Sequence, residues 1–241
     1  MSEQTQPIEQ KEISEEVAKK RKANNTWKKL LAEDIRFITN VVKDPLSLER
    51  AKSISYTKAS IEKMIALGGE VMKAEKVCTE KYADKKQQFA IFKQGLKNLE
   101  KEYMRHVKMA RKVFNQKEQP GIYDKLQLKG DRPNPLSEKI DYITKFYGFA
   151  LEDKEINDAF KKLSINDELM QQLLNLADEV VENNQLANLK LTHATRATEA
   201  REALKDEFYA WFKEFKVIYE LTPEPKPAPA SSTAKSAKAT T

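Results

Sequence analysis

An aromatic stripe between residues 202 and 221 constrains the fold of this chain more than any other feature. Its large side chains recur at helical spacing, and they are Phe208, Trp211, Phe212, Phe215, Ile218 and Tyr219. A helix with such a stripe on one face and charge on the other is stabilised mainly by neighbours that cover the stripe. We therefore expect these residues to be buried against other helices.

Composition extends this expectation to the whole chain. The 241 residues are 40% hydrophobic and 33% charged, and they include only six glycines. Long runs free of glycine and proline suit amphipathic helices and leave few turns for a sheet. The sequence therefore predicts an all-α fold, organised as an elongated antiparallel bundle or coiled coil of long helices with short helices at each end.

The sequence also predicts the cellular compartment of the protein. No apolar run approaches the roughly 18 residues that a membrane-spanning helix needs. The first residues are polar and acidic, unlike a secretory signal peptide. Cys78 is the only cysteine, which excludes an intrachain disulfide and gives no metal-site spacing. These features predict a cytoplasmic protein with no membrane partner.

Turn residues and composition divide the chain into five predicted segments. They are a disordered acidic N-terminus (1–12), a first helical repeat (13–117), a Pro/Gly loop (118–135), a second helical repeat (136–221) and a disordered Pro/Ala/Lys tail (222–241). The first repeat should open with a helix from Ser14 to Asp44, because Pro45 disfavours a further helical turn before it. A short helix over residues 46–53 should follow.

The two repeats share sequence, which predicts an internal duplication. LAEDIRFITNVV (31–42) matches LSEKIDYITKFY (136–147) at an offset of 105 residues. ALGGEV (66–71) matches NLADEV (175–180) at an offset of 109. Near the ends of the repeats, a four-residue slip is needed to align Tyr103, Val107 and Val113 with Phe208, Phe212 and Ile218.

Capping residues place the ends of the predicted helices. Thr57 and Asn166 suit the N-caps of two long helical segments, 58–115 and 167–221. Gly148 is a suitable C-cap for the first helix of the second repeat. A short helix over residues 151–163 should then follow.

The two long segments permit two topologies. Each could form one helix of about 55 residues, roughly 80 Å long, and the two helices would then run antiparallel. Alternatively, each segment could fold back, near Tyr82–Lys86 and near Asn183, to make two compact bundles. We favour the long helices because their near-heptad apolar spacing is not interrupted.

In the long-helix topology, the aromatic face at 208–219 packs against residues 27–42, and its counterpart at 103–114 packs against residues 140–147. The predicted core residues are Trp27, Ile35, Ile38, Tyr103, Val107, Ile140, Ile143, Phe208, Trp211, Phe212, Phe215 and Ile218.

Neither histidine indicates a catalytic or metal site. His106 follows Glu102 by four residues, whereas a di-iron bundle needs Glu-x-x-His twice plus further carboxylates. His193 has no acidic residue at ligand spacing. The chain also lacks Gly-x-Ser-x-Gly, Walker and Gly-x-Gly-x-x-Gly patterns. We therefore predict no catalytic residue, no cofactor, no metal and no small-molecule substrate, and we expect a protein that is not an enzyme.

Charge is unevenly distributed along the chain. Residues 17–130 carry a net charge of +14, whereas residues 131–221 carry −6. The basic clusters could neutralise phosphates, or they could be solvated helix faces. The candidate anion contacts are Lys19, Lys20, Arg21, Lys22, Arg105, Lys108, Arg111 and Lys112.

Five segments of the chain form a distinctive set, namely HVKMARKVF (106–114), YDKLQLKGDRP (123–133), ITKFY (143–147), ATEAREAL (197–204) and WFKEF (211–215). As a set they resemble a family of uncharacterised bacterial helical proteins. The resemblance implies two similar helical halves joined by a loop that contains leucine and glycine, and it implies no activity. The chain departs from the family after its last helix, where TPEPKPAP replaces a short leucine-rich segment.

These patterns predict a structural or interaction protein that uses helix faces and charge asymmetry to bind protein partners or itself. The alternative is a basic protein that associates with nucleic acid through its lysine-rich first half and its C-terminal tail.

Overall fold

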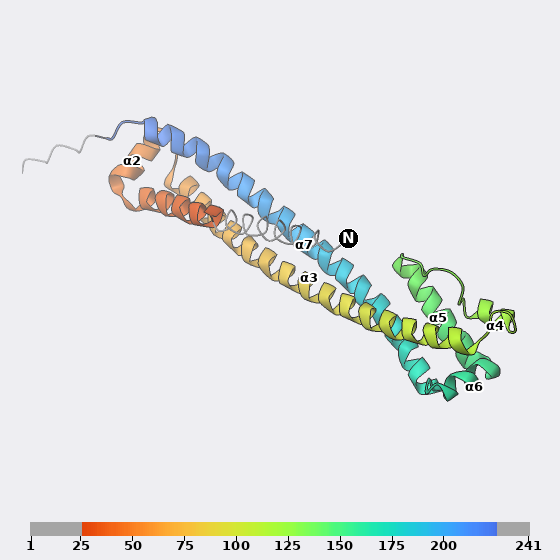
Figure 1. The fold of residues 1–241 in the computed structure, drawn as a ribbon. Coiled ribbons are helices and arrows are strands. Elements are labelled where there is room, and N and C mark those ends of the chain that lie inside the picture. The colour runs from red at the N-terminus through yellow and green to blue at the C-terminus, as the bar shows by residue number, and fades with distance from the viewer. Residues whose placement is uncertain (1–25, 226–241) are drawn as a thin grey trace, which may run out of the picture. The chain divides into compact units, whose positions relative to one another are not determined.

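A computed structural model describes residues 26–225, and within that range every regular element is an α-helix (Figure 1). The predicted all-α fold class is therefore confirmed. The helices span residues 26–43, Pro45–Ser53 (α2), Lys58–Val113 (α3), Pro120–Lys125 (α4), Leu136–Glu152 (α5), Lys154–Lys162 (α6) and Asp167–Leu221 (α7). None of the described helices is long and apolar enough to cross a membrane. The disordered segment predicted at 1–12, the helix start predicted at Ser14 and most of the predicted tail lie outside the described residues.

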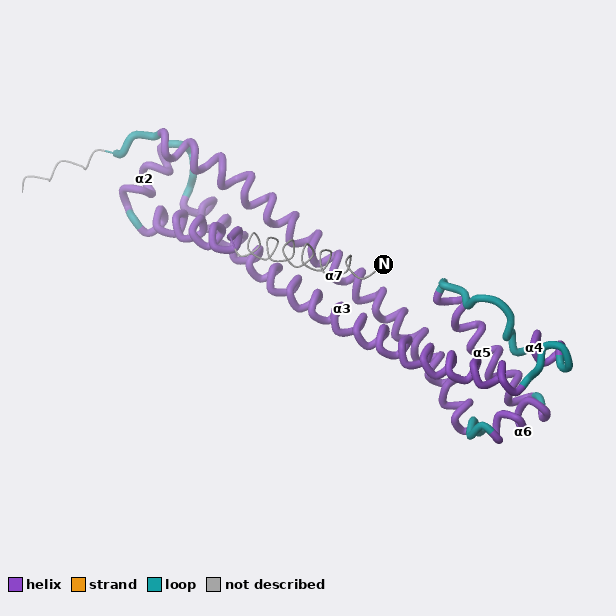
Figure 2. The backbone as a smooth tube through the Cα atoms, viewed as in Figure 1, coloured by secondary structure: helices purple, strands orange, loops and turns teal. Residues whose placement is uncertain are grey.

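Helices α3 and α7 are each continuous, as Figure 2 traces. The fold-back alternative, with turns near Tyr82–Lys86 and Asn183, is therefore wrong. Asn183 stays helical because its side-chain amide donates to the carbonyl oxygen of Glu179, 2.8 Å away, while its Oδ1 accepts from Gln88 on α3. An asparagine that is satisfied by a neighbouring helix has no need to start a turn.

The chain forms two compact units, and neither coincides with a half of the sequence. Unit 1 contains the described residues 26–77 and 198–225, and unit 2 contains Cys78–Ala197. Each unit takes one end of α3 and the opposite end of α7. In unit 1, Gly68 lies beside Phe208, and Glu75 lies beside Arg201, so the two helices run antiparallel there.

Unit 1 buries the aromatic stripe of α7 against the helix at residues 26–43. Phe37 packs against three α7 rings, with ring centroids between 5.8 and 6.4 Å apart. Among the predicted core residues of this unit, Ile38, Phe208, Phe212 and Phe215 are buried. Trp27, Ile35 and Trp211 are half-buried against the same cluster.

Ile218 is a correction to the predicted core, because its side chain is 38% exposed. On a helix with about 100° per residue, Ile218 lies about 80° away from Phe208, whereas Tyr219 lies about 20° away. Tyr219 therefore takes the inward position, and it is 7% exposed.

Unit 2 packs α5 and α6 against the end of α3 and the start of α7. The Tyr103 ring meets Phe146 of α5 edge-on at 5.3 Å. Of the residues predicted for this core, Tyr103, Val107 and Ile143 are buried, and Ile140 is half-buried against the cluster.

The segment at 118–135 was predicted as a loop, but part of it is helix α4. Leu126 and Leu128, which follow α4, are 0% and 1% exposed and join the core of unit 2. Pro120 occupies the first position of α4, where its missing N–H costs nothing.

The helix ends of the two units match at a single offset of 109 residues. Asp44 and Asp153 cap α2 and α6 with their side chains. Ser55 and Ser164 take positive φ after those helices, at 69° and 63°. Thr57 and Asn166 then cap the long helices, accepting from Ser60 N and Leu169 N.

Two predictions are wrong, one about a helix end and one about the alignment of the two repeats. Gly148 does not end its helix, because α5 continues to Glu152 and the next residue, Asp153, starts α6. The four-residue slip near the ends of the repeats is not needed. Four pairs of buried positions in α3 and α7 match at 109 residues: Ile61 with Met170, Val71 with Val180, Leu99 with Phe208, and Tyr103 with Phe212.

Candidate interaction surface on α3

The predicted anion contacts that lie within residues 26–225 do not form one free basic patch. Lys19, Lys20, Arg21 and Lys22 lie outside the described residues. Arg105 pairs with Glu102 at 3.1 Å. Arg111 donates to the carbonyl oxygens of Leu128 and Gly130, at 2.8 and 3.3 Å, and so fastens the segment after α4. Lys108 and Lys112 are exposed on α3.

The two histidines have different environments. His106 is 0% exposed, and its Nδ1 lies 2.9 Å from the hydroxyl of Tyr147. Burial lowers the pKa of His106, and the charge of Arg105 lowers it further. His193 is exposed on α7. Within residues 26–225, no three His, Cys, Asp or Glu side chains gather as metal ligands would.

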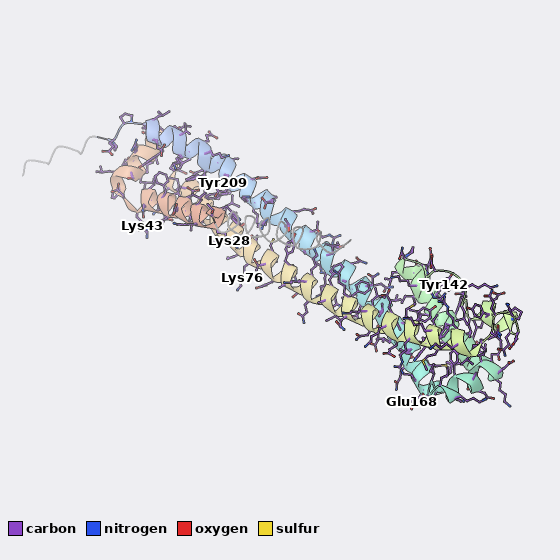
Figure 3. All side chains as sticks on the ribbon, in the orientation of Figure 1. Lys28, Lys43, Lys76, Tyr142, Glu168 and Tyr209 are labelled. Atoms are coloured by element: carbon purple, nitrogen blue, oxygen red, sulfur yellow. The ribbon has the colours of Figure 1, made fainter. Side chains whose placement is uncertain are left out.

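A buried ionic cluster lies in unit 1. Both carboxylate oxygens of Glu75 are used, by Lys28 Nζ and by Arg201 Nη1, each at 2.6 Å (Lys28 is labelled in Figure 3). Burial alone would raise the pKa of Glu75, but hydrogen bonds from Lys28 and Arg201 outweigh it and the pKa is lowered. Every charge here has a partner within the protein, so the cluster stabilises packing and leaves no charge to receive a ligand.

An open groove on α3 in unit 2 is different. Its volume is about 620 Å³, and its lining residues all come from one helix: Tyr82, Ala83, Lys85, Lys86, Phe89, Ala90 and Lys93. We call this surface the lysine-rimmed groove. Tyr82 is 49% exposed although its ring is large and mostly apolar. Spacing places Tyr82 and Phe89 two helical turns apart, on one side of the helix.

The small residues of the neighbouring helix explain why Tyr82 is exposed and Phe89 is only half-buried. Along this part of unit 2, the buried positions are Cys78, Ala187 and Ala194, so the seam between α3 and α7 is narrow. A pair of helices buries only such a seam, and side chains beside it reach solvent. Large apolar residues of the same stretch are exposed too, namely Ile91, Leu186, Leu189 and Leu191.

The rim of the groove is positively charged. The ammonium of Lys85 lies 5.3 Å from the centroid of the Tyr82 ring. Lys85, Lys86 and Lys93 form no ion pair with any of the described residues. An apolar floor with free cations at its edge suits a ligand that is itself apolar on one face and anionic beside it.

Sequence patterns could not identify this groove, because Phe89 has the spacing of a core residue. The signal that could have found it is the coincidence of three lysines with Tyr82 and Phe89, opposite an Ala-rich stretch of the second long segment. Comparison with known protein families, with curated proteins and with solved structures found no match for this chain. The resemblance to a family of bacterial helical proteins therefore stays a prediction.

Proposed function

We propose that this chain is a non-enzymatic interaction protein whose lysine-rimmed groove binds an amphipathic helix of a protein partner with acidic residues along its edges. The observation that carries the proposal is the exposure of Tyr82 on a stretch where, among residues 26–225, α3 and α7 pack together and leave its ring uncovered. Apolar side chains left in contact with water at such a place favour a helix that lies in the groove.

Charge supports an acidic partner. The free ammonium groups of Lys85, Lys86 and Lys93 would attract carboxylates and repel a basic helix. The chain itself carries a net charge of −6 over residues 131–221, so a second copy is one source of an acidic helix. We further propose that the chain meets this partner in the cytoplasm, the compartment that its composition predicts.

We also propose that the two units arose by internal duplication. The matching caps and positive-φ serines, all 109 residues apart, support this origin. A duplicated scaffold can keep one unit for stability while a groove develops on the other, which is consistent with a groove on α3 of unit 2.

The test uses two synthetic helical peptides with leucines on one face. One has glutamates along both edges, and the other has lysines at the same positions. Titration of the full chain, followed by fluorescence anisotropy, should show binding of the glutamate peptide alone. Tyr82→Ser together with Phe89→Ser should weaken binding by about tenfold or more, whereas Ile91→Ser, an exposed residue outside the groove, should not.

Light scattering at increasing protein concentration distinguishes self-association from the binding of a different protein. A dimer that disappears in Lys85→Glu with Lys86→Glu would identify a second copy as the occupant. Equal binding of both peptides, or binding of neither together with a monomer at every concentration, would contradict the proposal.

Nucleic acid is the second candidate, and exposed Tyr82 between lysines is the observation that favours it. Proteins that bind single strands combine cations for phosphates with aromatic rings for bases. A single-stranded thymidine oligonucleotide should then bind with an affinity that falls steeply with salt, and Tyr82→Leu should weaken it. No binding at low salt would exclude this function.

A further inference from the structure

The side of unit 2 that faces away from the lysine-rimmed groove is apolar and acidic. At about 100° per residue, Gly95 lies half a turn around α3 from Lys86. Gly95 lines a second groove, between α3 and α7, with a volume of about 460 Å³. Among the described residues, Glu179 is the only charged one in its lining, and Ala90 is the only one that it shares with the lysine-rimmed groove. Unit 2 therefore presents charges of opposite sign on two sides.

Exposed leucines of α7 lie on the acidic side. Leu186 and Leu189 are 40% and 50% exposed, and Glu179 and Glu182, which precede them on the helix, are exposed as well. Successive members of this set are three or four residues apart, so all four lie along one side of α7. Because Glu179 also lines the second groove, that side faces away from the lysine-rimmed groove. We call these four residues the acidic ridge.

The glutamates of the acidic ridge have no countercharge in the part of the chain that the structure describes. Neither Glu179 nor Glu182 forms an ion pair with any residue between 26 and 225. Lys190, one turn after Leu186, pairs instead with Asp84 of α3, at 3.8 Å. An apolar ridge with unpaired carboxylates complements a surface with an exposed ring and unpaired ammonium groups.

The acidic ridge also matches the lysine-rimmed groove in length. The groove spans about 16 Å of helix from Tyr82 to Lys93, and the ridge spans about 15 Å from Glu179 to Leu189. In either direction along the groove, the leucines of the ridge reach a ring while its glutamates reach a lysine. The ridge therefore has the apolar and acidic character that the groove requires of its ligand.

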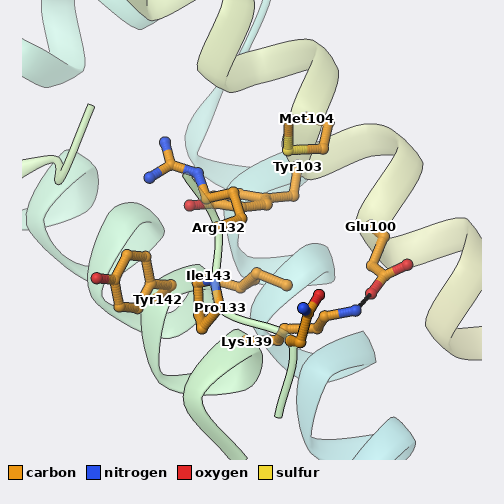
Figure 4. A pocket seen from close by; sticks show the side chains of 9 residues that line it. Glu100, Tyr103, Met104, Arg132, Pro133, Lys139, Tyr142 and Ile143 are labelled. Atoms are coloured by element: carbon orange, nitrogen blue, oxygen red, sulfur yellow. Dashed lines mark hydrogen bonds and ion pairs between the residues drawn. The ribbon is translucent and has the colours of Figure 1, made fainter. Parts of the chain in front are cut away.

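A separate hollow of unit 2 lies between α3, α5 and the segment that joins α4 to α5, and we call it the Arg132 cavity (Figure 4). Its charges are used within the unit. Lys139 lies 2.6 Å from Glu100, and Arg132 donates to the carbonyl oxygen of Gln127 at 2.5 Å. The guanidinium of Arg132 also lies over the ring of Tyr103. We therefore assign this cavity to the packing of unit 2.

We propose that the lysine-rimmed groove binds the acidic ridge of a second copy of this chain. The inference rests on the proposed function and names the partner. Because the groove and the ridge are different surfaces on two sides of unit 2, the contact between copies is heterologous. Two joined copies still have one free groove and one free ridge, so assembly continues beyond a dimer, into a ring or a filament.

The test combines two variants that each lose one surface. Lys86→Glu with Lys93→Glu reverses the charge of the groove, and Leu186→Ser with Leu189→Ser removes the apolar part of the ridge. All four side chains are exposed, so both variants should keep the fold, which circular dichroism checks.

Light scattering on the full chain should show a wild-type mass that rises with concentration beyond that of a dimer. Each variant alone should associate at least about tenfold more weakly. An equimolar mixture of the two variants should form a dimer and nothing larger, because only one intact groove and one intact ridge can meet. Val217→Ser removes a side chain of unit 1 that is 58% exposed, and it should leave the wild-type association unchanged.

The glutamate peptide separates failure of this inference from failure of the proposed function. A chain that binds the peptide but stays monomeric at every concentration would overturn the second copy as the occupant. A chain that neither binds the peptide nor self-associates would contradict the proposed function as well. A wild type that stops at a dimer, or a mixture of the two variants that stays monomeric, would overturn the heterologous contact.

Discussion

At one matched position in their cores, unit 1 buries Phe215 and unit 2 buries His106. Both side chains are 0% exposed. Phe215 lies among rings, 4.9 Å from Tyr56 and 4.9 Å from Trp211. His106 instead shares a hydrogen bond with Tyr147. Tyr147 corresponds to Ile38 of unit 1, so the two matched positions hold an apolar pair in unit 1 and a polar pair in unit 2.

A second difference places the polar group in unit 1 instead. Unit 1 buries Glu75, which pairs with the half-buried Arg201, and the matched positions in unit 2 hold Asn184 and Phe92. Each unit therefore has one polar pair, and the two pairs are at positions that do not correspond. One backbone scaffold accepts either kind of side chain where the partner changes with it, because an unpaired buried polar group is costly and a paired one is not.

The largest effect should come from forcing the chemistry of one core into the other. Phe215→His places an imidazole among rings with no tyrosine hydroxyl at the Ile38 position, and should cost about 3–5 kcal/mol of unfolding free energy. Phe215→Leu, which stays apolar, should cost less. Urea denaturation measures both, and equal losses would show that polarity at this position does not matter.

Removing the carboxylate of the ionic cluster should have the next largest effect. Glu75→Ala leaves Arg201, whose side chain is 15% exposed, without its buried partner, at a cost of about 2–4 kcal/mol. Glu202→Ala is the matched control, because Glu202 also bonds Arg201 but is 40% exposed, and it should cost less than about 1 kcal/mol.

The contribution of Glu75 to stability should also depend on pH. The pKa of Glu75 is lowered in the folded state from a usual 4.5, so its contribution is complete above that value and is lost as pH falls through the lowered pKa. Wild type and Glu75→Ala should therefore converge in stability below pH 4.5, and parallel curves would contradict the ion pairing.

The His106–Tyr147 pair of unit 2 should contribute less to the free energy of unfolding. His106→Phe leaves the buried Tyr147 hydroxyl unpaired, at about 1–3 kcal/mol, and adding Tyr147→Phe should recover part of that loss. The pKa of His106 is lowered from 6.5 by burial, so the unfolded chain takes up the proton first. Wild-type stability should fall as pH decreases below 6.5, and the double variant should lack this component.

Glycine substitutions give the smallest effects and oppose each other. A Cβ on Gly68 would lie 2.7 Å from Ile35 Cγ1, whereas one on Gly69 would meet nothing within 4 Å. Gly68→Ala should therefore destabilise by about 1–2 kcal/mol, and Gly69→Ala should stabilise by roughly 0.5–1 kcal/mol. The matched residue in unit 2 is Ala177, which is buried, so a neutral Gly68→Ala would mean that the units pack more alike than we infer.

Local signals predicted much of this fold. The N-caps Thr57 and Asn166 act on backbone groups within three residues of themselves, and the helical period of the stripe needs no tertiary information. The prediction that Gly148 ends its helix was wrong because tertiary packing outweighed the local signal. Its neighbours Tyr147 and Ala150 are buried against other helices, and this packing extends α5 past a residue that favours an end.

Register and sites were harder to predict. A slip of four residues turns a helix by only about 40° beyond a full turn, so offsets of 105 and 109 both align apolar residues with apolar ones, and only the caps decide. The Arg132 cavity combines residues of three separate segments, which periodicity along the chain cannot relate. The lysine-rimmed groove depends on α7, which has small residues such as Ala187 and Ala194 opposite it.

The continuity of α3 and α7 supports every comparison above, and backbone ¹³Cα chemical shifts test it most directly. If the account is correct, helical shifts continue without a break from Lys58 to Val113 and from Asp167 to Leu221. Coil-like shifts at Tyr82–Lys86 and at Asn183 would contradict it. They would mean that each long segment folds back on itself, and that the groove is not presented on a continuous helix.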